Sequence, residues 1–223
     1  MNLQVCVPYE KCPFNCPMCI ASNRKIYENL YDKCEELYFN RLKKQIENNY
    51  DFYVITGQTE PTLNKKWLEN TLKVLKGQKV ELQTKNYNLH NYNLEGLSTL
   101  CYSITSVKDY IKAYSFRKVV GSNRLVILLT KDFDFLNIEN FETFGFNQIT
   151  FKVLQKTNDK KVNAWIEKNE MKDFTKIYEI VNFYNGRNVS VRIDTNCQDS
   201  HGRYRIFRED GQLYYNWEIE TPL

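Results

Sequence analysis

Residues 52–84 read FYVITGQTEPTLNKKWLENTLKVLKGQKVELQT. The stretch opens with β-branched and aromatic side chains, which predicts a strand over Phe52–Thr56. A segment of helical periodicity follows over Asn64–Lys76, and Gly77 is a normal stop signal for a helix. Lys79–Thr84 then predicts a second strand. A strand, a helix and a strand in this order form a βαβ unit, whose two strands lie parallel.

The same alternation of strands and helices continues in both directions along the chain. Two more helices are predicted, at Lys33–Asn48 and Asp173–Asn185. The apolar face of the first of these holds Cys34, Leu37, Tyr38, Leu42 and Ile46. Six strands are predicted before the C-terminal part of the chain: Leu3–Val7, Phe52–Thr56, Lys79–Thr84, Leu100–Ile104, Leu125–Thr130 and Gln148–Leu154. Right-handed crossovers would curl the sheet toward a barrel or a doubly wound sheet. The predicted fold class is α/β, with a partial (β/α)6 TIM-like barrel as the expected architecture.

The last part of the chain has a different pattern. Ser190–Asp194 reads as another strand, and Arg203–Phe207 and Gln212–Trp217 flank the pair Asp210-Gly211, which is a hairpin signal. The sequence therefore predicts a C-terminal β-hairpin extension after the barrel.

We divide the chain into a partial-barrel domain over residues 1–195 and an extension over residues 196–223. The extension is expected to close the open side of the barrel and to choose the substrate. Candidate substrate-contacting or catalytic residues in and near it are Asp194, Asp199, His201, Arg203 and Arg205. The alternative is a hairpin that only pairs with a sheet edge and protects it from association.

Composition limits the class of protein. The chain has 223 residues, of which 42% are hydrophobic, as in a globular domain. No apolar run approaches the roughly 20 residues of a spanning helix, and the start lacks the pattern of a secretion signal. The net charge is +4, with basic residues scattered among acids, so nucleic acid binding is not indicated. We expect a cytoplasmic protein that has no membrane partner.

Three of the seven cysteines crowd into one loop, directly after the first predicted strand. Cys12, Cys16 and Cys19 have the spacing C-x-x-x-C-x-x-C. Thiolates are the usual ligands of iron–sulfur clusters, and three of them leave one iron of a four-iron cube open. A structural zinc site or idle thiols are the alternatives. Zinc sites usually draw on two cysteine pairs and no second pair is present, so the spacing favours a cluster.

Two segments together resemble the radical S-adenosylmethionine superfamily. The cysteine spacing matches the family's signature, with Met18 where the family usually has an aromatic residue. The run Gly57-Gln58-Thr59-Glu60-Pro61 is similar to the family's Gly-Gly-Glu-Pro segment, and it too follows a strand. Thr84-Lys85-Asn86 resembles the family's Thr-Asn turn, and Ser103 its ribose-contacting serine. The resemblance covers about residues 1–155 and ends before the C-terminal segment.

The resemblance implies a single-cluster enzyme with a [4Fe–4S] cluster and S-adenosyl-L-methionine as cofactors. It assigns the cluster to the three cysteines of the loop. The residues implied for S-adenosylmethionine binding are Met18, Gly57, Gln58, Thr59, Glu60, Ser103 and Leu154. The implied reaction is reductive cleavage to a 5′-deoxyadenosyl radical, which abstracts hydrogen from a small-molecule, nucleotide or peptide substrate. A one-electron donor such as flavodoxin or ferredoxin would be the partner.

Other interpretations stay open at this point. One is a glycyl-radical-enzyme activase that acts on a partner protein, and another is a non-enzymatic metal-binding module. Glu60 is alternatively a cap of the following helix, and Ser103 an ordinary strand residue. Cys6, Cys34 and Cys101 are best explained as buried small hydrophobic residues. His90 is expected in a surface loop.

Overall fold

The computed structural model describes residues 1–14, 16, 19, 26–116, 118, 120–130, 146–153, 160–161, 163–164, 180–184, 187–194, 204–217 and 221–223. The chain forms two compact units. The first holds Met1–Leu100 and Ser200–Leu223, and the second holds Cys101–Asp199. Strand β4 (Thr99–Ile104) crosses this boundary in the sequence. Helices alternate with mostly parallel strands, so the α/β class predicted from the sequence is confirmed.

Five strands form the sheet of the first unit, in the order β10-β9-β1-β2-β3. Their bounds are β1 (Asn2–Cys6), β2 (Phe52–Thr56), β3 (Val80–Thr84), β9 (Tyr204–Phe207) and β10 (Leu213–Tyr214). Strand β1 pairs in parallel with β2 and β9, and β2 pairs in parallel with β3. Strands β9 and β10 are antiparallel, so the predicted C-terminal hairpin is present. It extends the sheet beyond β1, as the sheet-edge alternative requires.

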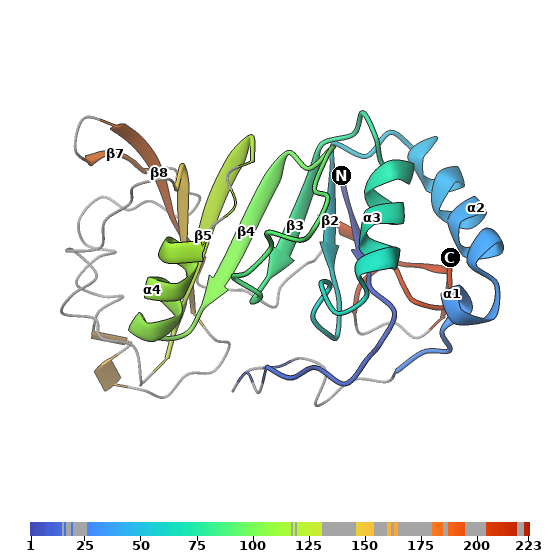
Figure 1. Cartoon of the computed structure of the whole chain (residues 1–223), viewed down its shortest axis with the longest axis horizontal. Coiled ribbons are helices and arrows are strands. Elements are labelled where there is room, and N and C mark those ends of the chain that lie inside the picture. Colours follow the sequence, from blue (N-terminus) through green and yellow to red (C-terminus); the bar gives the residue numbers. More distant parts are fainter. Residues whose placement is uncertain are drawn as a thin grey trace. The chain divides into compact units, whose positions relative to one another are not determined.

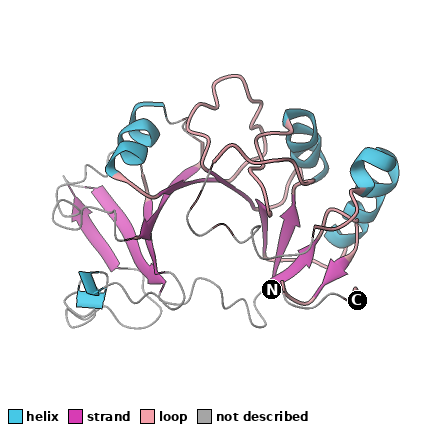
Figure 2. Cartoon of the chain, turned by 90° about the horizontal axis from the view of Figure 1, so that it is seen from below, coloured by secondary structure: helices cyan, strands magenta, loops and turns pink. Residues whose placement is uncertain are grey.

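Three helices belong to the first unit: α1 (Leu30–Lys33), α2 (Glu35–Ile46) and α3 (Lys65–Val74). Helices α2 and α3 lie on the same side of the strands of this unit (Figures 1 and 2). Tyr38 of α2 joins these layers, because its ring centroid lies 6.5 Å from that of Trp67 in α3 and 5.3 Å from that of Phe207 in β9. Its hydroxyl also donates to the backbone oxygen of Cys6 at 3.3 Å.

The buried face of α2 differs in part from the predicted one. Tyr38 and Leu42 are buried as expected, whereas Cys34 is exposed and Leu37 is 41% exposed. Two short-range features explain the difference. Cys34 is the residue that separates α1 from α2, and Tyr31 of α1 packs edge-on against Phe39 at 5.8 Å between ring centroids. Phe39 therefore takes the place in the core that the periodicity assigned to Leu37.

The second unit contains α4 (Val107–Phe116) and four further strands, in the order β5-β6-β8-β7. The strands are β5 (Ser122–Leu129), β6 (Gln148–Val153), β7 (Ile180–Tyr184) and β8 (Arg187–Asp194). Strand β6 pairs in parallel with β5 and with β8, and β7 is antiparallel to β8. Helix α4 has no counterpart among the predicted helices.

The helix predicted over Asp173–Asn185 is wrong at Ile180–Tyr184, which form strand β7. Residues 173–179 lie outside the described residues. The segment is rich in β-branched and aromatic side chains, and Tyr184 pairs with Arg187 across the two residues Asn185 and Gly186. Asn-Gly between two such runs is a strong hairpin signal, and it outweighs a helical stripe of apolar residues.

Among the strands that the structure describes, β10 and β7 lie at the two ends of the order, so these strands do not close into a ring. The partial (β/α)6 arrangement stays a prediction. In the described part of the chain, no helix is long and apolar enough to cross a membrane.

Candidate functional site

Three loops leave the carboxyl ends of neighbouring parallel strands in the first unit. The cysteine loop follows β1, the Gly57–Pro61 segment follows β2, and Thr84-Lys85-Asn86 ends β3 and begins the next loop. Strands β1, β2 and β3 are adjacent and parallel, so these loops gather at one edge of the sheet. This edge is where ligands bind in open α/β sheets.

The first two loops are in direct contact. A Cβ atom added to Gly57 would lie 3.0 Å from Cγ1 and 3.1 Å from the backbone nitrogen of Val7, so a larger residue would push the two strand ends apart. Just beyond, the Thr59 hydroxyl donates to the backbone oxygen of Glu10 at 2.6 Å. Both segments that carry the resemblance are therefore tied together close to Cys12.

Glu60 joins the second loop to the third. Its Oε1 accepts from the Thr62 backbone nitrogen at 3.1 Å, the Thr62 hydroxyl at 2.9 Å and the Thr84 hydroxyl at 2.5 Å. Its Oε2 accepts from the Lys85 backbone nitrogen at 2.9 Å. A carboxylate has about four lone-pair sites, so these bonds occupy most of its capacity. The side chain is only 6% exposed, and burial raises its pKa although the four bonds act to lower it.

The helix-cap interpretation of Glu60 is therefore wrong in this structure. Asn64 caps α3, because its side chain accepts from the Trp67 backbone nitrogen at 2.9 Å. Asn86 reinforces the connection that Glu60 makes, since its side-chain amide donates to the Thr62 hydroxyl at 3.1 Å. Thr62 and Lys85 are contributors that sequence reasoning did not assign a role. A hydroxyl two residues after an acid is a local signal for such a turn.

The three cysteines lie on a loop of partly exposed residues. Backbone turns shape it: the Cys16 nitrogen donates to Phe14 oxygen at 2.8 Å, and the Cys19 nitrogen to Cys16 oxygen at 3.1 Å. The Cys12 thiol makes a weak contact of 3.8 Å with the same Phe14 oxygen.

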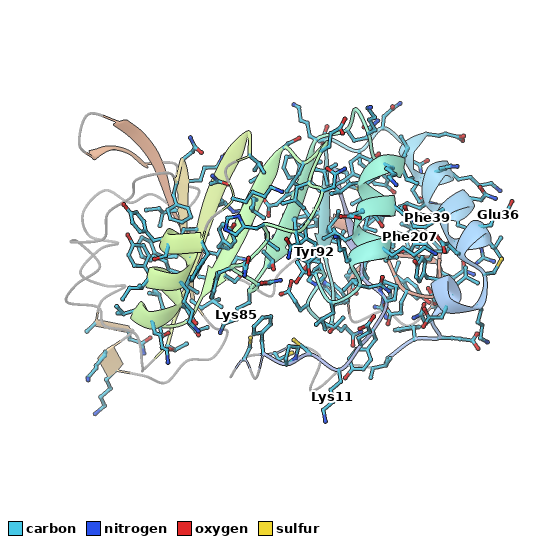
Figure 3. The ribbon with its side chains drawn as sticks, in the orientation of Figure 1. Lys11, Glu36, Phe39, Lys85, Tyr92 and Phe207 are labelled. Atoms are coloured by element: carbon cyan, nitrogen blue, oxygen red, sulfur yellow. The ribbon has the colours of Figure 1, made fainter. Side chains whose placement is uncertain are left out.

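Charged groups of the other two loops affect the pKa of the Cys16 thiol. Burial is the largest cause that raises the pKa of the Cys16 thiol, and Lys85 opposes it. Cys12, Cys19 and Glu60 each raise the same pKa further. The three thiols, the buried carboxylate and one lysine thus share one electrostatic neighbourhood. Figure 3 shows Lys85 at the end of the strands where the loop bearing Lys11 runs.

The thiols fit an iron–sulfur cluster in kind, since three cysteines of one loop supply three thiolate ligands. They are not yet arranged as a ligand set. Among the residues that the structure describes, no group of three or more His, Cys, Asp or Glu side chains is placed to hold a metal ion.

The remaining predicted site residues are spread over the chain. Gln58 and Thr59 are buried beside Glu60, whereas Ser103 lies in β4, within the second unit. Asp194 is the last residue of β8. Other predicted positions lie outside the described residues: Met18, Leu154, Asp199, His201 and Arg203. Cys6 and Cys101 are buried and His90 is exposed, as predicted.

Comparison of the sequence with known protein families found no family that matches it, and no curated protein matches it significantly.

Proposed function

We propose that the protein is a radical S-adenosylmethionine enzyme, in which Cys12, Cys16 and Cys19 hold a [4Fe–4S] cluster. The observation that carries the proposal is the bond between Thr59 and Glu10, which ties the cysteine loop to the segment similar to Gly-Gly-Glu-Pro. Two motifs that are separate in the sequence are thereby neighbours in one unit of the fold. The partial barrel and the cytoplasmic location belong to the same proposal.

The protein's own residues would bind and orient the cofactor. Backbone groups of Gly57–Thr59 lie next to the cysteine loop and are proposed to bind the amino group of S-adenosylmethionine. Glu60 contributes negative charge there and keeps the second and third loops in register through its four bonds. Met18, Ser103 and Leu154 are proposed to contact the adenosine portion. Their placement follows from the resemblance.

A cluster held by Cys12, Cys16 and Cys19 would supply one electron for cleavage of the sulfonium to methionine and a 5′-deoxyadenosyl radical, which would abstract hydrogen from the substrate. The electron would come from a donor such as flavodoxin or ferredoxin. The substrate is a small molecule, a nucleotide or a peptide.

The test is anaerobic incubation of the reconstituted protein with S-adenosylmethionine and a strong reductant. We expect 5′-deoxyadenosine and methionine to form, and Cys16→Ala to abolish the reaction. Cys34→Ala is the matched control, because Cys34 is exposed and lies at the start of α2, outside the loop. If the protein retains its cluster but does not cleave S-adenosylmethionine, the proposal is contradicted. The non-enzymatic metal-binding module would then be the remaining interpretation.

A further inference from the structure

A second group of buried charged residues lies in the turn between β9 and β10, at the carboxyl end of β9, which runs parallel to β1. The Arg208 backbone nitrogen donates to Gln212 oxygen at 3.0 Å, and the Gly211 nitrogen donates to Arg208 oxygen at 2.9 Å. Gly211 has a φ of 70°, a left-handed conformation that glycine adopts without strain. Asp210 closes the turn, because its side chain accepts from the Gln212 nitrogen at 2.9 Å and from the Tyr214 hydroxyl at 2.6 Å.

Arg208 is buried in an aromatic cage, with only 2% of the residue exposed. Its guanidinium carbon lies 4.3 Å from the ring centroid of Tyr27, 4.2 Å from that of Tyr214 and 5.7 Å from that of Trp217. Its Nη2 donates to the backbone oxygens of Asn216 and Trp217 at 3.1 and 3.0 Å. Cation–π contacts strengthen when the cation is desolvated, so the cage holds its rings firmly. Tyr27 is the ring that comes from a distant part of the chain.

Glu209 binds the same distant segment through hydrogen bonds. Its side-chain Oε1 accepts from the Tyr27 backbone nitrogen at 3.0 Å, and its backbone oxygen accepts from the Leu30 nitrogen at 2.9 Å. Gly211 lies so close that a Cβ atom on it would be 2.6 Å from Cδ2 of Leu30. The turn is therefore in direct contact with Tyr27–Leu30 through stacking, hydrogen bonds and close packing.

Tyr27–Asn29 end the connection between β1 and α1, and Leu30 begins α1; this is the connection that carries the three cysteines. Its first part is fixed by β1 and by the bond from Thr59 to Glu10. We infer that the C-terminal turn anchors its last part, and that Arg208, Glu209 and Tyr27 are positioning residues for the cysteine loop. This inference rests on the proposed function, because it assigns the anchor the task of holding a cluster-binding loop.

The anchor is tested by a matched pair of variants at one position. Tyr27→Ala removes the ring from Arg208, whereas Tyr27→Phe retains it. Amide hydrogen exchange of the full-length, cluster-free protein is measured over residues 26–34, with residues 65–74 of α3 as the internal control. We expect roughly tenfold faster exchange over residues 26–34 in Tyr27→Ala and wild-type exchange in Tyr27→Phe. Exchange unchanged in both variants would overturn the anchor.

The positioning role is tested in the reconstituted proteins by the rate of iron release to a chelator. We expect release to be roughly fivefold faster in Tyr27→Ala and to return to the wild-type rate in Tyr27→Phe. Faster exchange with unchanged iron release would overturn the positioning role. If Tyr27→Ala does not fold, Tyr27→Leu replaces it, because leucine keeps apolar packing without an aromatic face. If the reconstituted wild-type protein binds no iron, the proposed function is refuted. The hydrogen-exchange measurement, which uses cluster-free protein, would still show whether the C-terminal turn anchors residues 26–34.

Discussion

Glu60 and Arg208 are two buried charges of the first unit that are held in opposite ways. Glu60 accepts four hydrogen bonds from hydroxyl and backbone donors of two loops. Arg208 donates to two backbone oxygens and lies against aromatic rings. Both connect segments that are far apart in the sequence. The difference lies in what surrounds them, since Glu60 borders a loop of partly exposed thiols and Arg208 is closed within its cage.

The surroundings of Arg208 indicate a structural role, whereas those of Glu60 are consistent with a place beside the reacting groups. The charged groups of the C-terminal turn form bonds within the protein, so the turn is a support and its Arg208, Glu209 and Asp210 are not placed as substrate ligands. The expectation that the extension chooses the substrate concerns other residues, Asp199, His201, Arg203 and Arg205, and stays a prediction. The thiols and the Gly57–Thr59 backbone are the groups at which we expect chemistry.

Replacement of Arg208 should have the largest effect on stability. Arg208→Ala removes a buried cation from several aromatic faces and leaves a cavity, so we expect the free energy of unfolding to fall by about 3 kcal/mol. Arg205→Ala is the matched control, because the Arg205 guanidinium lies over the half-exposed Tyr215 ring at 4.5 Å. It should lower the free energy of unfolding by about 0.5 kcal/mol. Denaturant titrations measure both values. An equal decrease in the free energy of unfolding in Arg208→Ala and Arg205→Ala would show that the aromatic cage stabilises the protein no more than an exposed cation–π contact does.

Replacement of Glu60 should have an intermediate effect. Glu60→Ala leaves the Thr62, Thr84 and Lys85 donors without their acceptor, so we expect the free energy of unfolding to fall by about 2 kcal/mol. Glu60→Gln keeps one acceptor oxygen and should lose about half as much. Chemical denaturation of both variants measures the difference. Wild-type stability in Glu60→Ala would mean that the carboxylate does not join the two loops.

The bond between the two motifs should contribute least. Thr59→Val removes the hydroxyl that donates to Glu10 oxygen and leaves that oxygen without this donor, which should lower the free energy of unfolding by about 1 kcal/mol. Thr71→Val is the control, because the Thr71 hydroxyl is buried and has no hydrogen-bond partner in the described part of the chain. It should have the stability of the wild type or slightly more. A larger loss in Thr71→Val than in Thr59→Val would argue against the contact with Glu10.

Local patterns in the sequence predict most of the described elements of this fold. Phe52–Thr56 is a strand with the bounds that its composition predicts, and the helix after it begins one residue inside the predicted range. Strand β7 was missed because a stripe of apolar residues at helical spacing also occurs within a short apolar run, which periodicity alone does not assign to a helix or a strand. The Asn-Gly pair and the β-branched and aromatic side chains are the signals for the strand.

The sequence predicts which residues belong to the candidate site better than it predicts the residues with which they form hydrogen bonds or ring contacts. The cysteine spacing and Gly57–Glu60 are local patterns, and each follows a strand as predicted. The partners of Glu60 and Arg208 depend on long-range packing, and no local pattern pairs Tyr27 with Glu209 across 182 positions. The spacing of Cys12, Cys16 and Cys19 in the sequence does not predict the distances between their sulfur atoms, because those distances depend on contacts of the whole loop.

The central claim is that the cysteine loop binds one [4Fe–4S] cluster. The most direct measurement is the iron and acid-labile sulfide content of protein purified without oxygen, together with its visible absorbance. We expect about four irons and four sulfides per chain in the wild type and in Cys34→Ser, and loss of the cluster in Cys12→Ser, Cys16→Ser and Cys19→Ser. Zinc in place of iron, or an unchanged cluster in these three variants, would contradict the claim.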